Sequence, residues 1–150
     1  MRDRLQQEIK AALRAQDKSR LGALRLISAA LQEREIALRT DTLSEADTLA
    51  TLQKMLKQRR EAAAVYAKAG RADLERQETL EIAVIEEFLP KQLPAEEVER
   101  AITAIIKDVG ATSPRDIGKV MAVLKERYAG QIDFAQASGR VKALLQSGAA

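Results

Sequence analysis

Basic side chains recur at two places in this sequence where they could contact phosphate groups. In the segment 45–69, four cations fall within about a third of the circumference of a predicted helix, namely Lys54, Lys57, Arg60 and Lys68. The second group lies toward the C-terminus and comprises Lys119, Lys125, Arg127, Arg140 and Lys142. Contacts from such cations to a nucleic-acid backbone are independent of base sequence and sensitive to salt. The alternative interpretation of both groups is a solvated helix face.

Arg59 has a different setting, because it falls among apolar residues of the same predicted helix. Its neighbours at helical spacing are Leu52, Met55, Leu56, Ala63 and Tyr66. Glu81 likewise falls on the apolar stripe of the following helix, and Glu78 lies one turn before it. A buried charge is costly unless it is paired. We therefore predict a structural ion pair that joins Arg59 to Glu78 or Glu81 between adjacent antiparallel helices.

Side chains suited to catalysis are scarce in this chain. It contains no His and no Cys, which removes the commonest general base, the thiol nucleophile and Cys-ligated zinc. Ser138 and Lys142 are four residues apart, but a Ser–Lys pair also needs an oxyanion hole and a desolvated lysine. The neighbouring Gly139 and Arg140 indicate neither. We therefore assign no catalytic residue, no metal ligand and no cofactor.

The composition indicates a globular protein that is mildly basic. Of its 150 residues, 46% are hydrophobic and 31% are charged, and the formal net charge is +3. Aromatic residues make up only 3%, so stacking of side chains on bases is not a main binding mode. The first residues are charged, and no apolar run approaches the length of a signal peptide or a membrane span. We expect a cytoplasmic protein that has no membrane partner.

The elements that would position these side chains are all helical. Apolar residues recur with the helical period of about 3.6 residues, and no stretch keeps the two-residue period of a strand. Breaks and caps that delimit four N-terminal helices stand at Asp17, Ser44, Gly70 and Pro90. The apolar face of the second helix is marked by Leu21, Leu24, Ile27, Leu31 and Leu38. Three further helices are delimited by Pro94, Gly110, Ser113, Gly130 and Asp133. The fold class predicted from these patterns is all-α.

The segment from Phe88 to Pro94, with two prolines four residues apart, separates the two groups of helices. We predict an N-terminal four-helix domain over residues 1–90 and a small three-helix domain over residues 94–147. The alternative is a simple corner between helices of one domain. Gly118 falls inside a predicted helix, where it costs about 1 kcal/mol relative to Ala. Close packing of a helix or close approach of a ligand backbone would explain this glycine.

Four short motifs follow one another along the chain: Lys57-Gln-Arg-Arg60, Ala69-Gly-Arg-Ala-Asp-Leu74, Phe88-Leu-Pro-Lys-Gln-Leu93 and Gly118-Lys-Val-Met121. Together they closely resemble the YqeY-like proteins of the GatB/YqeY family, over essentially the whole chain. The resemblance implies that the stretch from about Pro94 to Leu145 is similar to the tail domain of GatB, a component of the glutamine-dependent Glu-tRNA(Gln)/Asp-tRNA(Asn) amidotransferase. In that carbon–nitrogen ligase the tail helps to hold the tRNA, and the catalytic machinery lies elsewhere.

Three functions are compatible with these features. The resemblance favours a non-catalytic accessory protein that binds tRNA, or a tRNA-modifying or aminoacylation protein, through its C-terminal helices. One alternative is a protein–protein interaction module in which the N-terminal helices dock a partner without RNA. The other alternative is an amidotransferase-associated enzyme, although the chain is too short to contain either catalytic part of the amidotransferase.

Overall fold

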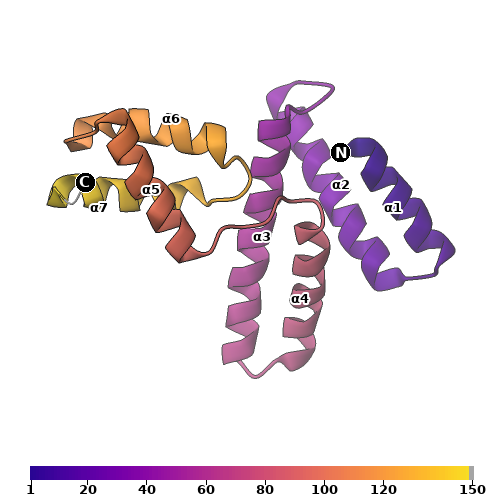
Figure 1. The fold of residues 1–150 in the computed structure, drawn as a ribbon. Coiled ribbons are helices and arrows are strands. Elements are labelled where there is room, and N and C mark those ends of the chain that lie inside the picture. The colour runs from indigo at the N-terminus through magenta and orange to yellow at the C-terminus, as the bar shows by residue number, and fades with distance from the viewer. Residues whose placement is uncertain (149–150) are drawn as a thin grey trace. The chain divides into compact units, whose positions relative to one another are not determined.

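The computed structural model describes residues 1–148, and every regular element in that range is a helix. The predicted all-α fold is thus confirmed. The first four helices are α1 (Arg2–Arg14), α2 (Lys18–Leu38), α3 (Glu45–Lys68) and α4 (Ala72–Glu86). They are followed by α5 (Ala95–Val109), the short 3-10 helix η1 (Pro114–Asp116), α6 (Ile117–Arg127) and α7 (Phe134–Ser147) (Figure 1). No helix within residues 1–148 is long and apolar enough to cross a membrane.

Contacts between residues divide the chain into two compact units, Met1–Pro90 and the residues from Lys91 onward. We call them the N-terminal unit and the C-terminal unit. Each unit has its own cluster of buried apolar side chains. Leu93 precedes the domain start predicted at residue 94, but its N–H donates to the carbonyl of Gln131 (3.0 Å). The segment before α5 is therefore tied to the C-terminal unit.

The N-terminal unit consists of two antiparallel helix pairs, α1 with α2 and α3 with α4 (Figure 1). Helix α4 also packs against α2 and so joins the two pairs. The core is mostly aliphatic, with Phe88 as an aromatic member, and its most deeply buried residues include Leu24, Ile27, Leu52 and Ile85. Burial of each such side chain stabilises the fold by about 1.5 to 3 kcal/mol.

Short polar side chains begin three of the helices. Asp17 accepts a hydrogen bond from a backbone N–H in the first turn of α2, and the Ser44 hydroxyl does the same for α3. In the C-terminal unit the Asp133 carboxylate accepts backbone N–H groups in the first turn of α7. The sequence predicts these starts because each cap satisfies a donor within one helical turn of itself.

Helices α5, α6 and α7 pack around a single aliphatic core in the C-terminal unit. Its fully buried members are Ile102, Ile105, Ile106, Val120, Leu124 and Val141. Gly110 ends α5 at a φ of +67°, a conformation that costs a residue with a Cβ about 1 to 2 kcal/mol. The Asp116 carboxylate then accepts the N–H groups of Thr112 and Ser113 (3.0 and 3.3 Å), which closes the turn before α6. These hydrogen bonds lower the pKa of Asp116.

Two positions differ from what the sequence predicts. Leu38, expected on the apolar face of α2, is exposed. Leu38 is the last residue of α2 and lies about one turn beyond Glu35, the residue that Arg2 contacts. The second position is Gly118, where an added Cβ would meet no atom within 4 Å. Close packing of another helix therefore does not explain this glycine.

Candidate functional site

Arg59 on α3 faces two carboxylates on α4. Its Nη1 lies 3.5 Å from Glu78 Oε2, and its Nε lies 3.1 Å from Glu81 Oε2. Both acids are buried, at 8% and 7% exposure, whereas the Arg59 side chain is 31% exposed. The Gln77 amide adds a hydrogen bond to the Glu81 carboxylate (3.2 Å). One guanidinium is thus shared by two buried acids, an arrangement that holds α3 and α4 in register.

The other predicted cations of α3 lie on the surface of the N-terminal unit. Lys57 is exposed. Arg60 is exposed as well, and its Nη2 lies 2.9 Å from Glu86 Oε1 on α4. An exposed ion pair of this kind contributes at most about 1 kcal/mol. Arg60 can therefore exchange its carboxylate for another anion at little cost.

Two of the five cations predicted in the C-terminal unit contact acids of α5. Arg140 Nε lies 2.8 and 2.7 Å from the two carboxylate oxygens of Glu99. These hydrogen bonds lower the pKa of Glu99 and raise that of Arg140. Arg127 Nη1 lies 3.8 Å from Asp108 Oδ2. Both arginines therefore join helices of this unit, which their spacing in the sequence does not reveal.

The three predicted lysines of this unit are exposed. Lys119 Nζ lies 3.9 Å from Asp116 Oδ1, at the outer limit of an ion pair. Within residues 1–148, Lys125 and Lys142 have no acid at ion-pair distance. Lys119 and Lys125 are about 120° apart around α6, because a helix turns by about 100° per residue. These two lysines therefore lie at the two edges of a face that covers about a third of the circumference of α6.

Charge is segregated among the helices of the C-terminal unit. Helix α5 has two cations and the four carboxylates of Glu96, Glu97, Glu99 and Asp108. The residues from Pro114 to Gly148 have six cations and only three carboxylates. The side of the unit built from α6 and α7 therefore has an excess of positive charge, even though two of its arginines are paired with α5.

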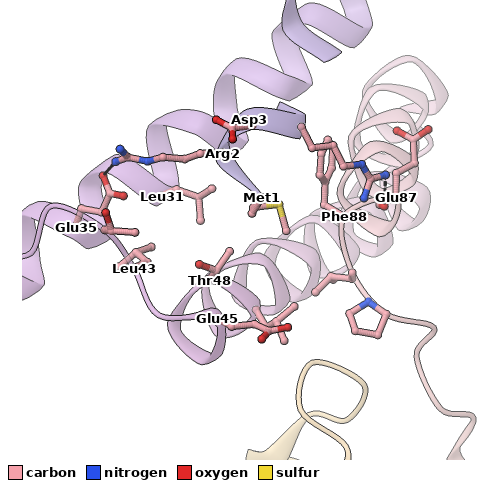
Figure 2. A pocket seen from close by; sticks show the side chains of 15 residues that line it. Met1, Arg2, Asp3, Leu31, Glu35, Leu43, Glu45, Thr48, Glu87 and Phe88 are labelled. Atoms are coloured by element: carbon pink, nitrogen blue, oxygen red, sulfur yellow. Dashed lines mark hydrogen bonds and ion pairs between the residues drawn. The ribbon is translucent and has the colours of Figure 1, made fainter. Parts of the chain in front are cut away.

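A pocket of about 710 Å³ opens in the N-terminal unit, where sequence patterns predict no site. Its walls come from the start of α1, the second half of α2, the start of α3 and the residues after α4 (Figure 2). Apolar side chains that line it include Leu31, Leu43, Leu49, Phe88 and Leu89. Charged side chains at its wall and rim include Arg2, Asp3, Arg4, Glu35 and Glu45.

Glu35 is a buried acid of this pocket, at 7% exposure. Its carboxylate accepts a hydrogen bond from Arg2, whose side chain is 61% exposed. Figure 2 shows this pair at one side of the pocket and Phe88 at the other. The guanidinium of Arg4 lies 4.6 Å from the centre of the Phe88 ring and donates to the Glu87 carbonyl (2.9 Å). The pocket thus combines apolar walls with a buried carboxylate.

Residues 2–145 match the model of a family described as Yqey-like protein, so the match takes in helices of both units. The chain belongs to this family. The match agrees with the resemblance carried by the four sequence motifs. A curated relative of this YqeY-like chain is "Altered inheritance of mitochondria protein 41, mitochondrial" of Kluyveromyces lactis. The two are 27% identical over 142 residues, which are 93% of this chain and 72% of the relative.

For one residue that lines the pocket of this YqeY-like chain, the sequence pattern indicates burial. Glu35 follows Leu31 by four residues on the apolar face of α2, just as Arg59 falls among the apolar residues of α3. A charge at such a position is buried and requires a partner. The partner itself has no such signal, because Arg2 lies 33 residues away and no helical period connects the two.

Proposed function

We propose that this YqeY-like chain is a non-catalytic accessory protein that binds tRNA through its C-terminal unit. The observation that supports the proposal is the excess of cations on α6 and α7, where Lys125 and Lys142 are exposed and have no acidic partner in residues 1–148. Phosphate groups are the complementary ligand. The resemblance of this unit to the GatB tail domain of the amidotransferase favours tRNA as the molecule that supplies them.

The expected mode of binding is contact with the RNA backbone. The chain has two Tyr, two Phe and no Trp, which leaves few rings to stack on unpaired bases. Lysine and arginine contacts to phosphate position an RNA without reading its bases. The affinity should therefore depend strongly on salt and weakly on the sequence of the tRNA.

Fluorescence anisotropy with labelled bulk tRNA at several salt concentrations tests this proposal. We expect the affinity to fall as salt rises, because lysines that contact phosphate release bound counterions. The double substitution Lys125→Glu with Lys142→Glu should weaken binding. It should also reduce the slope of log affinity against log salt by about 1 for each lost contact.

The matched control is Arg100→Glu with Lys107→Glu, which makes the same change of charge on α5 of the same unit. Both control residues are exposed. We expect the control to leave the salt slope nearly unchanged. If the two double variants lost equal affinity for tRNA, the net charge of the unit alone would account for the attraction of RNA. Absence of salt-dependent binding by the unaltered chain would refute the tRNA proposal.

A further inference from the structure

Three adjoining hollows of the N-terminal unit share the pair formed by Arg2 and Glu35. The pocket of about 710 Å³ is one of them, and the others have volumes of about 370 and 390 Å³. Together they extend from Phe88, after α4, to Ile36 and Arg39 at the end of α2. We call these three hollows the α1–α2 groove. The Arg2 side chain lines each of them and so lies where they meet.

The α1–α2 groove has apolar surface on both sides of the buried acid. Leu31, Phe88 and Leu89 form apolar walls at one end. Ile36 lines the opposite end and is 72% exposed. A ligand that fits must therefore offer apolar groups spaced along its length, as the side chains of a polypeptide are.

Five acids (Asp3, Glu35, Asp41, Glu45 and Glu87) and three arginines (Arg2, Arg4 and Arg39) line the groove, so its charge favours a cation. Among residues 1–148, Arg2 is the one ion-pair partner of Glu35. Because the Arg2 side chain is exposed, the free energy gained from this pair is largely offset by the conformational entropy that the side chain loses. Asp3 and Glu45 at the rim are exposed acids without an ion pair in the same range. Arg4 is engaged by the Phe88 ring and the Glu87 carbonyl. An incoming cation can replace Arg2 without leaving the buried carboxylate unpaired.

We propose that the α1–α2 groove binds a segment of a partner protein in which a Lys or Arg stands beside apolar side chains. The cation of that segment takes the place of Arg2 on Glu35, and an apolar side chain packs against Leu31, Phe88 and the half-exposed Met1 (Figure 2). Arg2 thus occupies the site when the partner is absent and competes with it. This proposal concerns the N-terminal unit and does not depend on the binding of tRNA by the C-terminal unit.

Selection of phage-displayed random peptides on the full-length chain tests the proposal. We expect enrichment of peptides with Arg or Lys next to Leu, Ile or Phe. The affinity of a selected peptide is then measured by fluorescence anisotropy against variants whose circular dichroism shows that they are folded. Glu35→Gln keeps the shape of the side chain and should weaken binding by about tenfold or more, since it removes a charge-assisted hydrogen bond. Glu33→Gln, an exposed position on the same helix, is the matched control and should bind as the unaltered chain does.

The Arg2→Ala variant shows whether Arg2 competes with the peptide for Glu35 or only supports the fold. If Arg2 competes with the partner, its removal tightens peptide binding by at least about threefold, because the cation of the peptide then pairs with a buried carboxylate that has lost its partner. If the pair with Glu35 only supports the fold, the same substitution weakens binding. This variant too is used only where its circular dichroism shows that it is folded, because it leaves the buried Glu35 carboxylate without its cation.

Three results would overturn the proposal. One is a selection that returns acidic or uncharged peptides, or peptides that bind Glu35→Gln as well as the unaltered chain. Another is equal affinity for free argininamide, which would mean that the groove takes a small cation and not a polypeptide. The third is self-association of the chain that disappears in Glu35→Gln while no peptide is selected, which would identify a second copy as the occupant.

Discussion

Arg59, Glu78 and Glu81 form a cluster whose energy depends on burial as well as on distance. A buried carboxylate that loses its partner costs several kcal/mol, whereas an exposed ion pair contributes between zero and about 1 kcal/mol. Arg60 and Glu86 form an exposed pair between the same two helices. The two arginines therefore allow the effect of burial to be measured within one helix pair.

We expect Arg59→Met to lower the free energy of unfolding of the N-terminal unit by about 2 to 3 kcal/mol, because it leaves two buried acids without a cation. The value is below that of a fully enclosed pair, since water reaches the Arg59 side chain. Arg60→Met is the control and should change the same free energy by less than about 1 kcal/mol. Hydrogen exchange of the amides of α3 and α4, followed by NMR, measures this free energy of unfolding in both variants. Small, equal changes in the two variants would contradict this account.

At the scale of the helix, the glycines of the C-terminal unit have unlike roles. Gly110 stands at the end of α5 with a positive φ. Gly118 lies inside α6, has no positive φ, and has open space where a Cβ would be. The first glycine is thus required by backbone conformation, whereas the fold of residues 1–148 places no such requirement on the second.

Gly118→Ala should therefore raise the free energy of unfolding of the C-terminal unit by about 0.5 to 1 kcal/mol, because Ala has less backbone freedom to lose on forming a helix. Gly110→Ala should lower it by about 1 to 2 kcal/mol, since Ala is strained at this φ. Hydrogen exchange of the amides of α6 reports both values. If Gly118→Ala is stabilised and yet loses affinity for tRNA, the backbone of a ligand approaches this position. Destabilisation by Gly118→Ala would refute the prediction.

On the scale of the whole molecule, the chain has two separate aliphatic cores, one in each unit. Ile102 and Leu24 are both fully buried, the first in the C-terminal core and the second in the N-terminal core. Since each buried apolar cluster described in residues 1–148 belongs to one unit, we expect a cavity made in one unit to leave the packing of the other unchanged. Unfolding of the two units tests the domain prediction of residues 1–90 and 94–147.

Ile102→Ala should destabilise the C-terminal unit by about 2 to 5 kcal/mol, the usual cost of a large cavity. We expect hydrogen exchange to accelerate in α5, α6 and α7 and to stay unchanged in α1 to α4. Leu24→Ala, the converse variant, should accelerate exchange in α1 to α4 alone. Loss of protection throughout the chain in either variant would show that the two units unfold as one domain.

The ion-pair partners of most charged side chains could not be predicted from the sequence. Five cations of the C-terminal unit were predicted to contact phosphate, yet Arg127 and Arg140 lie against acids of α5. Helical spacing shows which side of its own helix a residue occupies. It indicates a partner on a neighbouring helix only where both charges fall on apolar faces, as for Arg59 and Glu81. In the N-terminal unit, the burial of Glu35 was not predicted, although the residue follows Leu31 by one helical turn, and nothing in the sequence indicated Arg2 as its partner.

The amino-acid sequence by itself determined the all-helical fold, the capped helix starts at Asp17, Ser44 and Asp133, and the placement of Arg59 on an apolar face. These features depend on residues within one or two helical turns of each other, so periodicity and capping chemistry are enough to read them. Tertiary structure alone decided which cations are neutralised and where a pocket opens. Arg140 and Glu99 are 41 residues apart, and Arg2 and Glu35 are 33 apart. Such contacts form only when the helices pack, because packing sets which faces meet.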